Sequence, residues 1–373
     1  MSKTAIVIGS GIVSIATTLV LLDKGYQVRI IERNSTSMGA SVRNFGMIWP
    51  IGQPKGIYLE LANKSKSIWE KMSKIAGFHF NNNGSLHLAY DQEEKNVLLE
   101  FIESESRDRN IQWLSAPETL EISKGTNKSN LAGSMWSGSE CLVDPREAVA
   151  KLILYLEQHP NCEMIFGVPI LNISDNICYS IGKNYTADKI FICTGGEMNV
   201  LFPELFNKKG VPCELQMMRT GKQPNNFKLG PSLCAGLTLL HYKAFAKLNA
   251  LTELKAKMES EKEFFIRNGI HVMAAQNQLG EVTIGDSHKY GNINDPFIDQ
   301  DINDHIIDYL KTFCLMPDMN IRSYWKGVYL KSRTDDLYCI ETINPYCNWI
   351  NCFGGAGMTL SFGVLDYEID NLI

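Results

Sequence analysis

Residues 5–14 read AIVIGSGIVS, and this stretch decides the fold. Its first four residues are apolar throughout, as in a parallel strand that is covered on both faces. Gly9 and Gly11 then make a tight turn into a helix, where free backbone N–H groups can bind a pyrophosphate. Ser14 stands where the common pattern has Gly or Ala, and it is small enough for close helix–strand packing. The stretch therefore predicts the start of a dinucleotide-binding domain.

The residues that follow support the same interpretation. A helix is expected from Gly11 to about Lys24, and a second strand over 27–32 completes a βαβ unit. Glu32 lies about 20 residues beyond the turn, where an acid binds a ribose 2′-hydroxyl and disfavours the 2′-phosphate of NADP. The alternative is an apolar strand–helix unit with chance glycines. The candidate cofactor residues of this unit are Gly9, Ser10, Gly11, Ile12, Val13, Glu32 and Arg33.

Three distant stretches carry further small residues. Residues 39–47 (GASVRNFGM) form a loop able to pack against a flat ring, and 194–196 (TGG) end a buried strand. Residues 354–359 (GGAGMT) begin the last long helix, whose N–H groups suit negative charge on a bound ring. A flavin ring needs contacts far from its pyrophosphate, so the pattern favours FAD. The candidates here are Ser41, Arg43, Asn44, Phe45, Gly46, Met47, Val168, Thr194, Gly195, Gly196, Gly354, Gly355, Gly357, Met358 and Thr359.

Composition limits the remaining possibilities. The 373 residues are 45% hydrophobic, enough for two domains, and the net charge of −5 is dispersed, which disfavours a nucleic-acid partner. The ten cysteines include no CxxC pair, so we expect reduced, buried thiols and no metal site. Residues 5–22 approach the length of a membrane span. A buried strand and helix explain this run better, and we expect a cytoplasmic protein without a membrane span.

A coarse pass along the chain predicts the other elements. Asp144 and Pro145 read as the N-cap and first residue of a helix. Residues 78–90 read as a hairpin around Asn82-Asn83-Gly84, and 135–143 as one strand. Further helices are expected near 55–76, 92–108, 251–268 and 300–314, and further strands near 189–194, 213–220, 233–240, 270–275 and 281–285.

Taken together, the four glycine-containing elements resemble the D-amino-acid oxidase/glycine oxidase/sarcosine oxidase superfamily of FAD-dependent amine oxidoreductases. The resemblance covers essentially the whole chain. Residues 39–47, 215–220 (LQMMRT), 269–273 (GIHVM), 284–288 (IGDSH) and 327–331 (GVYLK) further resemble a subfamily associated with aminophosphonate catabolism.

The resemblance implies a two-domain α/β fold. A Rossmann-like FAD-binding domain would comprise residues 1–78, 144–212 and 320–373, and an inserted mixed β-sheet substrate domain 79–143 and 213–319. It implies non-covalent FAD, hydride transfer from the carbon of a C–N bond to flavin N5, and hydrolysis of the imine. No obligatory catalytic acid or base is implied. The partner is a small-molecule amine, the electron acceptor is oxygen or unknown, and the chain is a monomer or homodimer.

One departure from the superfamily bears on the substrate. Many amino-acid oxidases carry an Arg shortly after Trp-x-Gly, whereas Trp325-Lys326-Gly327 leads here to Lys331. Lys331 as a point charge and Arg219 as a bidentate partner would suit a phosphonate, unless both are solvated strand-end charges. His288 lies in the same region. The candidate substrate residues are Trp49, Gln53, Arg219, His241, Tyr242, His271, Tyr329 and Lys331.

We therefore expect oxidation of a small amine that bears an acidic group, with 2-aminoethylphosphonate and its N-methyl derivative as candidates. The alternatives are a glycine, sarcosine or D-amino-acid oxidase, and a flavin-binding module without catalysis.

Overall fold

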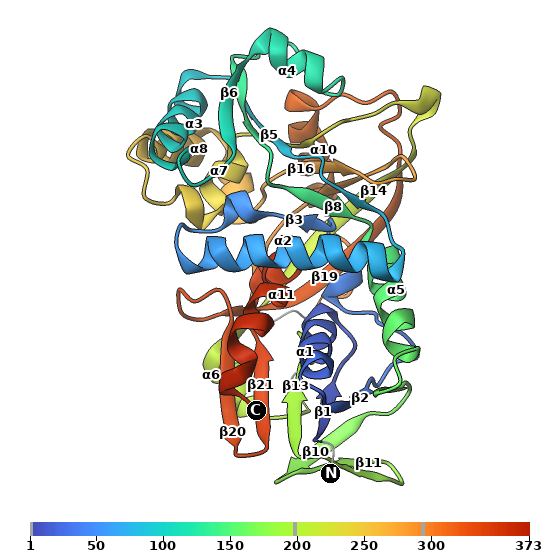
Figure 1. Cartoon of the computed structure of the whole chain (residues 1–373). Helices are drawn as coiled ribbons and strands as arrows, with labels where there is room; N and C mark the ends of the chain where they lie inside the picture. The colour runs from blue at the N-terminus through green and yellow to red at the C-terminus, as the bar shows by residue number, and fades with distance from the viewer. Residues whose placement is uncertain (1–2, 197–199, 292–294) are drawn as a thin grey trace.

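The computed structural model describes residues 3–196, 200–291 and 295–373, which form two lobes with helix α2 between them (Figure 1). The lower lobe holds a six-stranded sheet in the order β20-β21-β13-β1-β2-β9, parallel except for β20 at its edge. Its strands are β1 (Thr4–Ile8), β2 (Gln27–Ile31), β9 (Cys162–Ile165), β13 (Lys189–Ile192), β20 (Cys339–Asn344) and β21 (Cys347–Asn351). This arrangement is the predicted Rossmann-like domain.

Both faces of this sheet are covered, as the unbroken apolar run of β1 predicts. Ala5 and Val7 pack in a core with the helices, whereas Ile6 and Ile8 pack in a second core on the opposite face. The helices are α1 (Ile12–Asp23), α2 (Ile57–Ala76), α5 (Pro145–Glu157) and α11 (Gly357–Glu368). The other face meets a small sheet of β10 (Ile170–Ser174), β11 (Ile177–Ser180) and β12 (Asn184–Thr186), and α6 (Pro203–Lys209) lies nearby.

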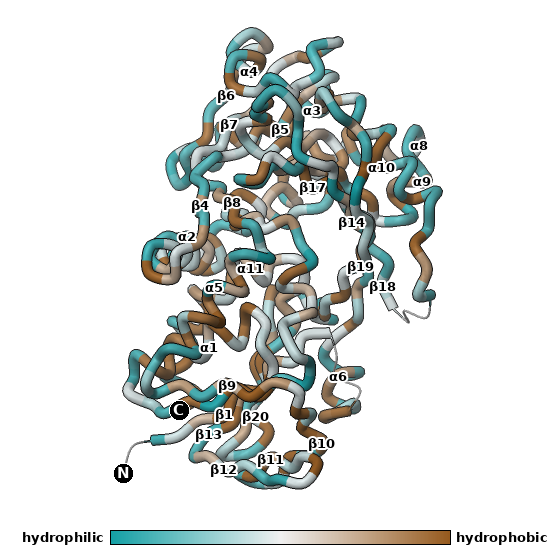
Figure 2. The backbone as a smooth tube through the Cα atoms, turned by 90° about the vertical axis from the view of Figure 1, so that its right-hand side faces the viewer, coloured by the Kyte–Doolittle hydropathy of each residue, from teal (hydrophilic) through white to brown (hydrophobic). Residues whose placement is uncertain are grey.

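Figure 2 shows the same two lobes from the side, with apolar segments concentrated inside each. The upper lobe holds a nine-stranded mixed sheet in the order β18-β14-β17-β16-β15-β5-β7-β6, with β19 also paired to β14. Its strands are β5 (Ser85–Ala89), β6 (Ile111–Ser115), β7 (Gly133–Ser137), β14 (Gly210–Lys222), β15 (Ser232–Cys234), β16 (Met273–Gln276), β17 (Glu281–Gly285), β18 (Lys289–Tyr290) and β19 (Ile321–Ser332). Its helices are α3 (Gln92–Glu105), α4 (Ala116–Ile122), α7 (Leu237–His241), α8 (Leu251–Glu261), α9 (Glu263–Arg267) and α10 (Gln300–Phe313).

The long pair β14 and β19 links the two lobes. The strands pair antiparallel from Gly210↔Ser332 to Thr220↔Ile321, so β19 belongs to the upper sheet before the chain returns to β20 and β21. The expected domain boundary at residue 320 would separate β19 from β14, and the boundaries themselves stay a prediction. A third sheet of β3 (Met47–Ile48), β8 (Cys141–Val143) and β4 (Phe80–Asn81) lies between the lobes.

Four local expectations are wrong. Residues 78–90 form no hairpin, because β4 pairs with β8 while β5 pairs with β7 and β15. The single strand expected over 135–143 is two strands, β7 and β8, which lie in different sheets. Residues 237–241 form helix α7 rather than continuing β15, and the helix expected over 251–268 is divided at Lys262. In each case a distant partner strand or a local break overrides the short-range pattern.

Among the described residues, no helix has both the length and the apolar character that crossing a membrane requires.

Helices α2 and α11 pack so closely that a glycine is needed at their crossing. A Cβ at Gly363 would overlap the backbone carbonyl of Leu61, and the Gly363 N–H donates to Ser65 Oγ at 2.7 Å. Nearby, Trp69 of α2 is fully buried and donates from Nε1 to the Met358 carbonyl at 2.8 Å. The N-terminus of α11, which faces the cavity described below, is thus positioned by α2.

We predict that Gly363→Ala destabilises the protein by about 1–3 kcal/mol, the usual cost of overpacking, because the helices must separate. Thermal unfolding followed by circular dichroism should show a midpoint lower by several degrees. The control is Tyr367→Ala on the exposed side of the same helix, where Tyr367 is 57% exposed. An unchanged midpoint for Gly363→Ala would contradict the proposed close packing.

Candidate functional site

One cavity of about 790 Å³ is lined by both lobes. It begins at the carboxyl ends of β1 and β2, passes the N-termini of α1 and α11, and reaches the upper sheet at Met217 and Met273. Ligands of open α/β sheets bind at the carboxyl ends of the strands, so this position is the expected one. The volume and shape suit a large, elongated ligand with a smaller one beside it.

The glycine turn at the start of the cavity is tightly packed. Gly9 has φ +105°, and a Cβ on it would lie 2.7 Å from the Cys193 carbonyl oxygen. A Cβ on Gly11 would lie 3.0 Å from Ser41 Oγ, which accepts the Ile12 N–H at 2.9 Å. Helix α1 has no acidic residue in its first turn and no side-chain cap from Gly11. Its N-terminus therefore offers backbone N–H groups to an anionic group such as a pyrophosphate.

Glu32 lies at the end of β2 beside this turn. Its side chain is buried and accepts Ser10 N–H at 3.0 Å, Ser10 Oγ at 2.9 Å and Asn34 N–H at 2.8 Å. Val168 follows β9 and donates its N–H to the Glu32 carbonyl at 3.0 Å. Glu32 and Val168 both line the cavity, where a carboxylate can accept ribose hydroxyls.

The loop 39–47 forms the next part of the wall. Asn44 holds it in shape, because its amide donates to the Ala40 carbonyl at 2.8 Å and accepts the Gly46 N–H at 2.7 Å. Arg43 lines the cavity with its neighbours, but Gly46 does not. Gly46 instead has φ +79°, and a Cβ on it would overlap the Val143 carbonyl oxygen. Its role is to let the loop pack against β8.

The far end of the cofactor region is formed by the N-terminus of α11. Thr359 is buried and accepts the Trp49 N–H at 2.9 Å, which ties the helix to the loop before α2. Trp49 Nε1 is buried without a hydrogen-bond partner. A Cβ on Gly355 would be 3.5 Å from the Tyr329 hydroxyl, so β19 closes this end. Together these groups offer an aromatic wall, an unpaired donor and the free N–H groups of a helix.

Beyond Trp49 the cavity is lined by a row of aromatic rings. The Trp49 and Tyr242 rings are 6.3 Å apart, Tyr242 and His271 are 5.7 Å apart, and His271 and His288 stack at 5.1 Å. His241 stacks on His271 at 3.8 Å. His241 and Tyr242 lie at the end of α7, and His271 and His288 lie at one end of the antiparallel β16–β17 pair, before β16 and after β17. The predicted histidines therefore do meet in one place.

Asp286 lies among these histidines. Its Oδ1 is 3.1 Å from His271 Nε2, and its Oδ2 is 3.9 Å from His288 Nε2. Burial raises the pKa of the Asp286 carboxyl well above its ordinary value. Burial also lowers the pKa of His271 well below its ordinary value, and lowers that of His288 to about 4. The two histidines are therefore neutral at physiological pH.

A positive charge stands at the end of this row. Lys331 Nζ lies 3.4 Å from the Tyr290 hydroxyl and 4.9 Å from the centre of the Tyr290 ring. Within the part of the chain that the structure describes, no carboxylate forms an ion pair with Lys331. Lys331 lines the cavity beside Tyr290 and Tyr329, so its charge is available to an anionic group.

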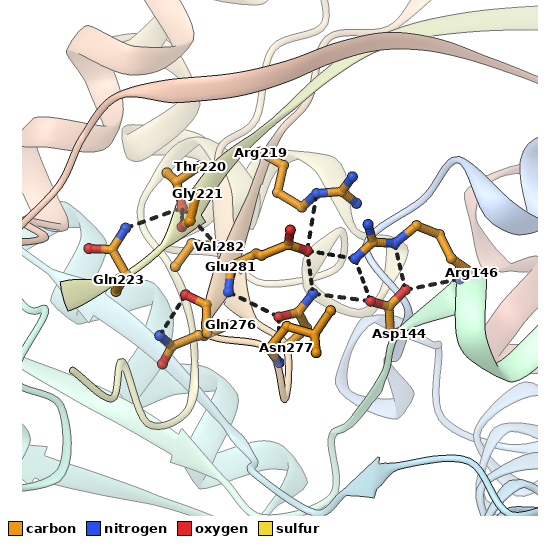
Figure 3. A network of polar contacts seen from close by, with 12 residues as sticks. Asp144, Arg146, Arg219, Thr220, Gly221, Gln223, Gln276, Asn277, Glu281 and Val282 are labelled. Atoms are coloured by element: carbon orange, nitrogen blue, oxygen red, sulfur yellow. Dashed lines mark hydrogen bonds and ion pairs between the residues drawn. The ribbon is translucent and has the colours of Figure 1, made fainter. Parts of the chain in front are cut away.

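Arg219 does not line the cavity. It belongs instead to the polar network drawn in Figure 3. Its Nε is 3.5 Å from Glu281 Oε2, and its guanidinium lies 5.2 Å from the Trp325 ring. Glu281 also pairs with Arg146 at 2.6 Å, and Arg146 pairs with Asp144 at 2.6 Å. The network joins the N-terminus of α5 to the upper sheet, so the position of Arg219 indicates a structural role at the junction of the lobes.

The cavity thus includes the predicted cofactor and substrate residues except Gly46 and Arg219. Sequence reasoning gave no role to Asp286 and Tyr290, and it left His288 outside the final candidates. The signal for two of them was present, since Asp286 and His288 both lie in the motif 284–288. The polar turn residues, the unpaired Trp49 donor and the glycine turns fit an FAD molecule.

Comparisons with known proteins agree with this geometry. A family model described as FAD dependent oxidoreductase (DAO) matches residues 4–364. The fold is similar to that of glycine oxidase from Bacillus cereus ATCC 14579, with a TM-score of 0.79 at 15% identity over 100% of this chain and 95% of that one. A search of curated protein sequences gives no match.

Two other solved structures are also similar. L-alpha-glycerophosphate oxidase from Mycoplasma pneumoniae, a structure with FAD bound, gives a TM-score of 0.76 at 16% identity over 100% of this chain and 95% of that one. Iminodiacetate oxidase from Chelativorans sp. BNC1 gives 0.73 at 14% identity over 98% and 95%. At these identities the structural likeness supports the fold alone.

We predict that Gly9→Ala weakens FAD binding about tenfold or more, because an L side chain at this φ costs about 1–2 kcal/mol before its contact with Cys193 is counted. Fluorescence titration of apoprotein with FAD measures the change. Gly25→Ala is the matched control: Gly25 also has a positive φ, of +81°, but no atom lies within 4 Å of its Cβ position. Equal FAD affinity in Gly9→Ala and Gly25→Ala would contradict the assigned role of Gly9 in cofactor binding.

Proposed function

The chain belongs to the family of FAD-dependent oxidoreductases, and from this premise we propose that it oxidises a small amine that carries an acidic group. FAD is the cofactor of this family, and when bound it supplies a hydride acceptor for the carbon that bears the amine. The resulting imine hydrolyses to a carbonyl compound and an amine or ammonia. The residues of this chain would hold the substrate beside the cofactor and exclude water.

The observation that carries the proposal is Lys331. It lines the cavity beyond the cofactor region, and no carboxylate of the described residues pairs with it. A cation without an anionic partner beside two tyrosine hydroxyls, those of Tyr290 and Tyr329, is suited to a substrate anion. Asp286 lies among the neutral histidines, and a cationic group beside it would favour the ionised form of its carboxyl against the effect of burial. A substrate with an amine at one end and an acid at the other matches this polarity.

We further propose a phosphonate as the acidic group, with 2-aminoethylphosphonate or its N-methyl derivative as the candidate substrate. An Arg fork matches a planar carboxylate, whereas a Lys ammonium binds a tetrahedral anion as a point charge. Similar folds include proteins named for glycine, for iminodiacetate and for a glycerophosphate. A carboxylate amine is therefore the alternative, as in a glycine, sarcosine or D-amino-acid oxidase.

The first experiment is anaerobic bleaching of the visible flavin band by a panel of amines. The panel holds 2-aminoethylphosphonate, N-methyl-2-aminoethylphosphonate, glycine, sarcosine and D-alanine. Bleaching by a phosphonate alone supports the finer proposal, and bleaching by an amino acid overturns it while leaving amine oxidation intact. Bleaching by no member of the panel would count against the whole proposal and favour a module without catalysis.

We predict that Lys331→Met raises the concentration of amine needed for half-maximal bleaching about 10- to 100-fold, the cost of losing one charge-assisted hydrogen bond. The rate at saturation should change less, because Lys331 binds the anion rather than the reacting carbon. Lys311→Met is the control, since Lys311 is exposed on α10 and pairs with Asp308 at 2.8 Å. Equal half-saturation in wild type and Lys331→Met would rule out the assigned anion site.

A further inference from the structure

The proton position on His288 is fixed by the backbone. Its Nδ1 lies 2.9 Å from the Gly269 carbonyl oxygen, which can only accept a hydrogen bond. The ring proton of neutral His288 is therefore on Nδ1, and the lone pair is on Nε2. His288 is 6% exposed and lines the cavity. The cavity thus contains a hydrogen-bond acceptor held in one orientation.

A second acceptor faces this atom. Asp286 Oδ2 lies 3.9 Å from His288 Nε2, and the ring proton is on the other side of the imidazole. The other carboxylate oxygen, Oδ1, is enclosed near His271 and leaves Oδ2 for a ligand. Among the described residues, no donor makes a hydrogen bond to His288 Nε2, and no other residue donates one to Asp286 Oδ2. When Asp286 is ionised, Oδ2 is an acceptor beside the His288 lone pair, and a ligand that donates hydrogen bonds to both and carries positive charge would offset the burial that raises the pKa of the carboxyl.

The chemistry of the cluster selects among three kinds of ligand. An anion is disfavoured, because it would lie against the Asp286 carboxylate and the histidine lone pairs. A metal ion is the second kind of ligand, since His241, His271 and His288 have ligand atoms within 4.8 Å of one another. However, the His241 and His271 rings stack at 3.8 Å with an interplanar angle of 28°, so their in-plane lone pairs do not converge on one point. An ammonium group has several N–H donors and a charge that Asp286 can neutralise.

Building on the proposed function, we propose that Asp286 Oδ2 and His288 Nε2 bind the ammonium group of the substrate, and that His288 takes one of its protons. One N–H bond of the substrate breaks, and its electron pair stays on the substrate nitrogen. A new N–H bond forms at Nε2. The imidazolium keeps its Nδ1–H hydrogen bond to Gly269, and Asp286 provides the opposite charge. The substrate is left as the neutral amine, the form from which hydride loss is possible.

The surroundings of His288 suit this exchange. Burial, with a smaller effect of the Lys331 charge, lowers its pKa to about 4 against the opposing effect of the Gly269 hydrogen bond, so the lone pair is present before the substrate arrives. An anionic group bound at Lys331 would offset that positive charge, and Asp286 would then stabilise the imidazolium. The titratable and charged groups that face His288 are His241 on α7, His271 before β16, Asp286 after β17, Cys213 on β14, Tyr290 on β18, and Tyr329 and Lys331 on β19.

The test is the pH dependence of anaerobic flavin reduction at saturating amine. In wild type, the limiting rate should be nearly constant from pH 6 to 9, because the proton passes from the bound ammonium to His288 without exchange with the solvent. Gln at 288 keeps a polar atom near Nε2 but cannot take the proton. His288→Gln should lower the rate at pH 7 by about 10²–10⁴-fold. Its rate should then rise about tenfold per pH unit toward the pKa of a free alkylamine, near 10.

Two other variants separate this role from a structural one. Asp286→Asn should weaken substrate binding and lower the rate of flavin reduction. The difference between its rate and the wild-type rate at pH 7 should also become smaller as the pH rises. His79→Gln removes an exposed imidazole outside the cavity and should leave both rate and pH profile unchanged. Retention of FAD and a wild-type circular dichroism spectrum will show that each variant is folded.

A spectroscopic measurement tests the proton position without turnover. An amine without hydrogen on its α-carbon cannot be oxidised, and ¹⁵N-labelled (2-amino-2-methylpropyl)phosphonate, or 2-aminoisobutyrate if an amino acid is the substrate, serves as the probe. At pH 7 its ¹⁵N shift should be that of a neutral amine in wild-type holoenzyme and that of an ammonium in His288→Gln.

The outcomes are distinguishable. If no amine bleaches the wild type, the proposed function fails and the inference fails with it. If amines bleach the wild type but His288→Gln follows a parallel pH profile, only the inference is overturned. A stoichiometric metal ion in the purified protein that His288→Gln removes would also overturn it, because the lone pair would then be occupied.

Discussion

The packing of the first glycine turn against the end of β13 is the constraint on which the rest of the structure depends. Gly9 donates its N–H to the Ile31 carbonyl at 2.9 Å, and Cys193 donates to the Ile8 carbonyl at 2.9 Å. A Cβ at Gly9 would lie 2.7 Å from the Cys193 carbonyl oxygen. The three central strands thus end at one level, with no side chain between them. This places the N-terminus of α1 and the carboxylate of Glu32 at the same edge of the sheet.

The second half of the site reaches this edge by a different route. Strand β19 leaves the upper sheet, and the chain then forms β20 and β21 before α11 begins beside α1. Tyr329 and Lys331 therefore stand between the histidine cluster of the upper lobe and the glycine turn before α11. Under the proposed function, a substrate held by the upper lobe would in this way meet a cofactor held by the lower one. The network of Asp144, Arg146 and Glu281 spans the same junction (Figure 3).

Most of the cofactor region could be predicted from the sequence because its signals are local. A glycine turn between a strand and a helix, and an acid at the next strand end, need only short-range geometry. The β-sheet of the upper lobe could not be predicted so well, since β5 pairs with β7 and β15 rather than with the adjacent β4. Arg219 shows the same limit at the level of one side chain. Its position on a strand was evident, but the Glu281 that binds it approaches from a neighbouring strand.

The meeting of the histidines with Asp286 could not be predicted from the sequence. Three histidines in separate segments are most often unrelated, and only the pairing of β16 with β17 brings His271 and Asp286 together, with two backbone hydrogen bonds between them of 3.1 and 2.8 Å.

Once His271 and Asp286 are together, their electrostatics follow from burial. A low dielectric disfavours charge on both imidazole and carboxyl, so the empty site is biased toward neutral groups. A substrate that brings both a cation and an anion supplies the charges that such a site lacks, the anion at Lys331 and the cation at Asp286. A simple alkylamine would lack the contact that an anionic group can make with Lys331. The proposed selectivity for an amine that carries an acid thus rests on the electrostatics of the cavity.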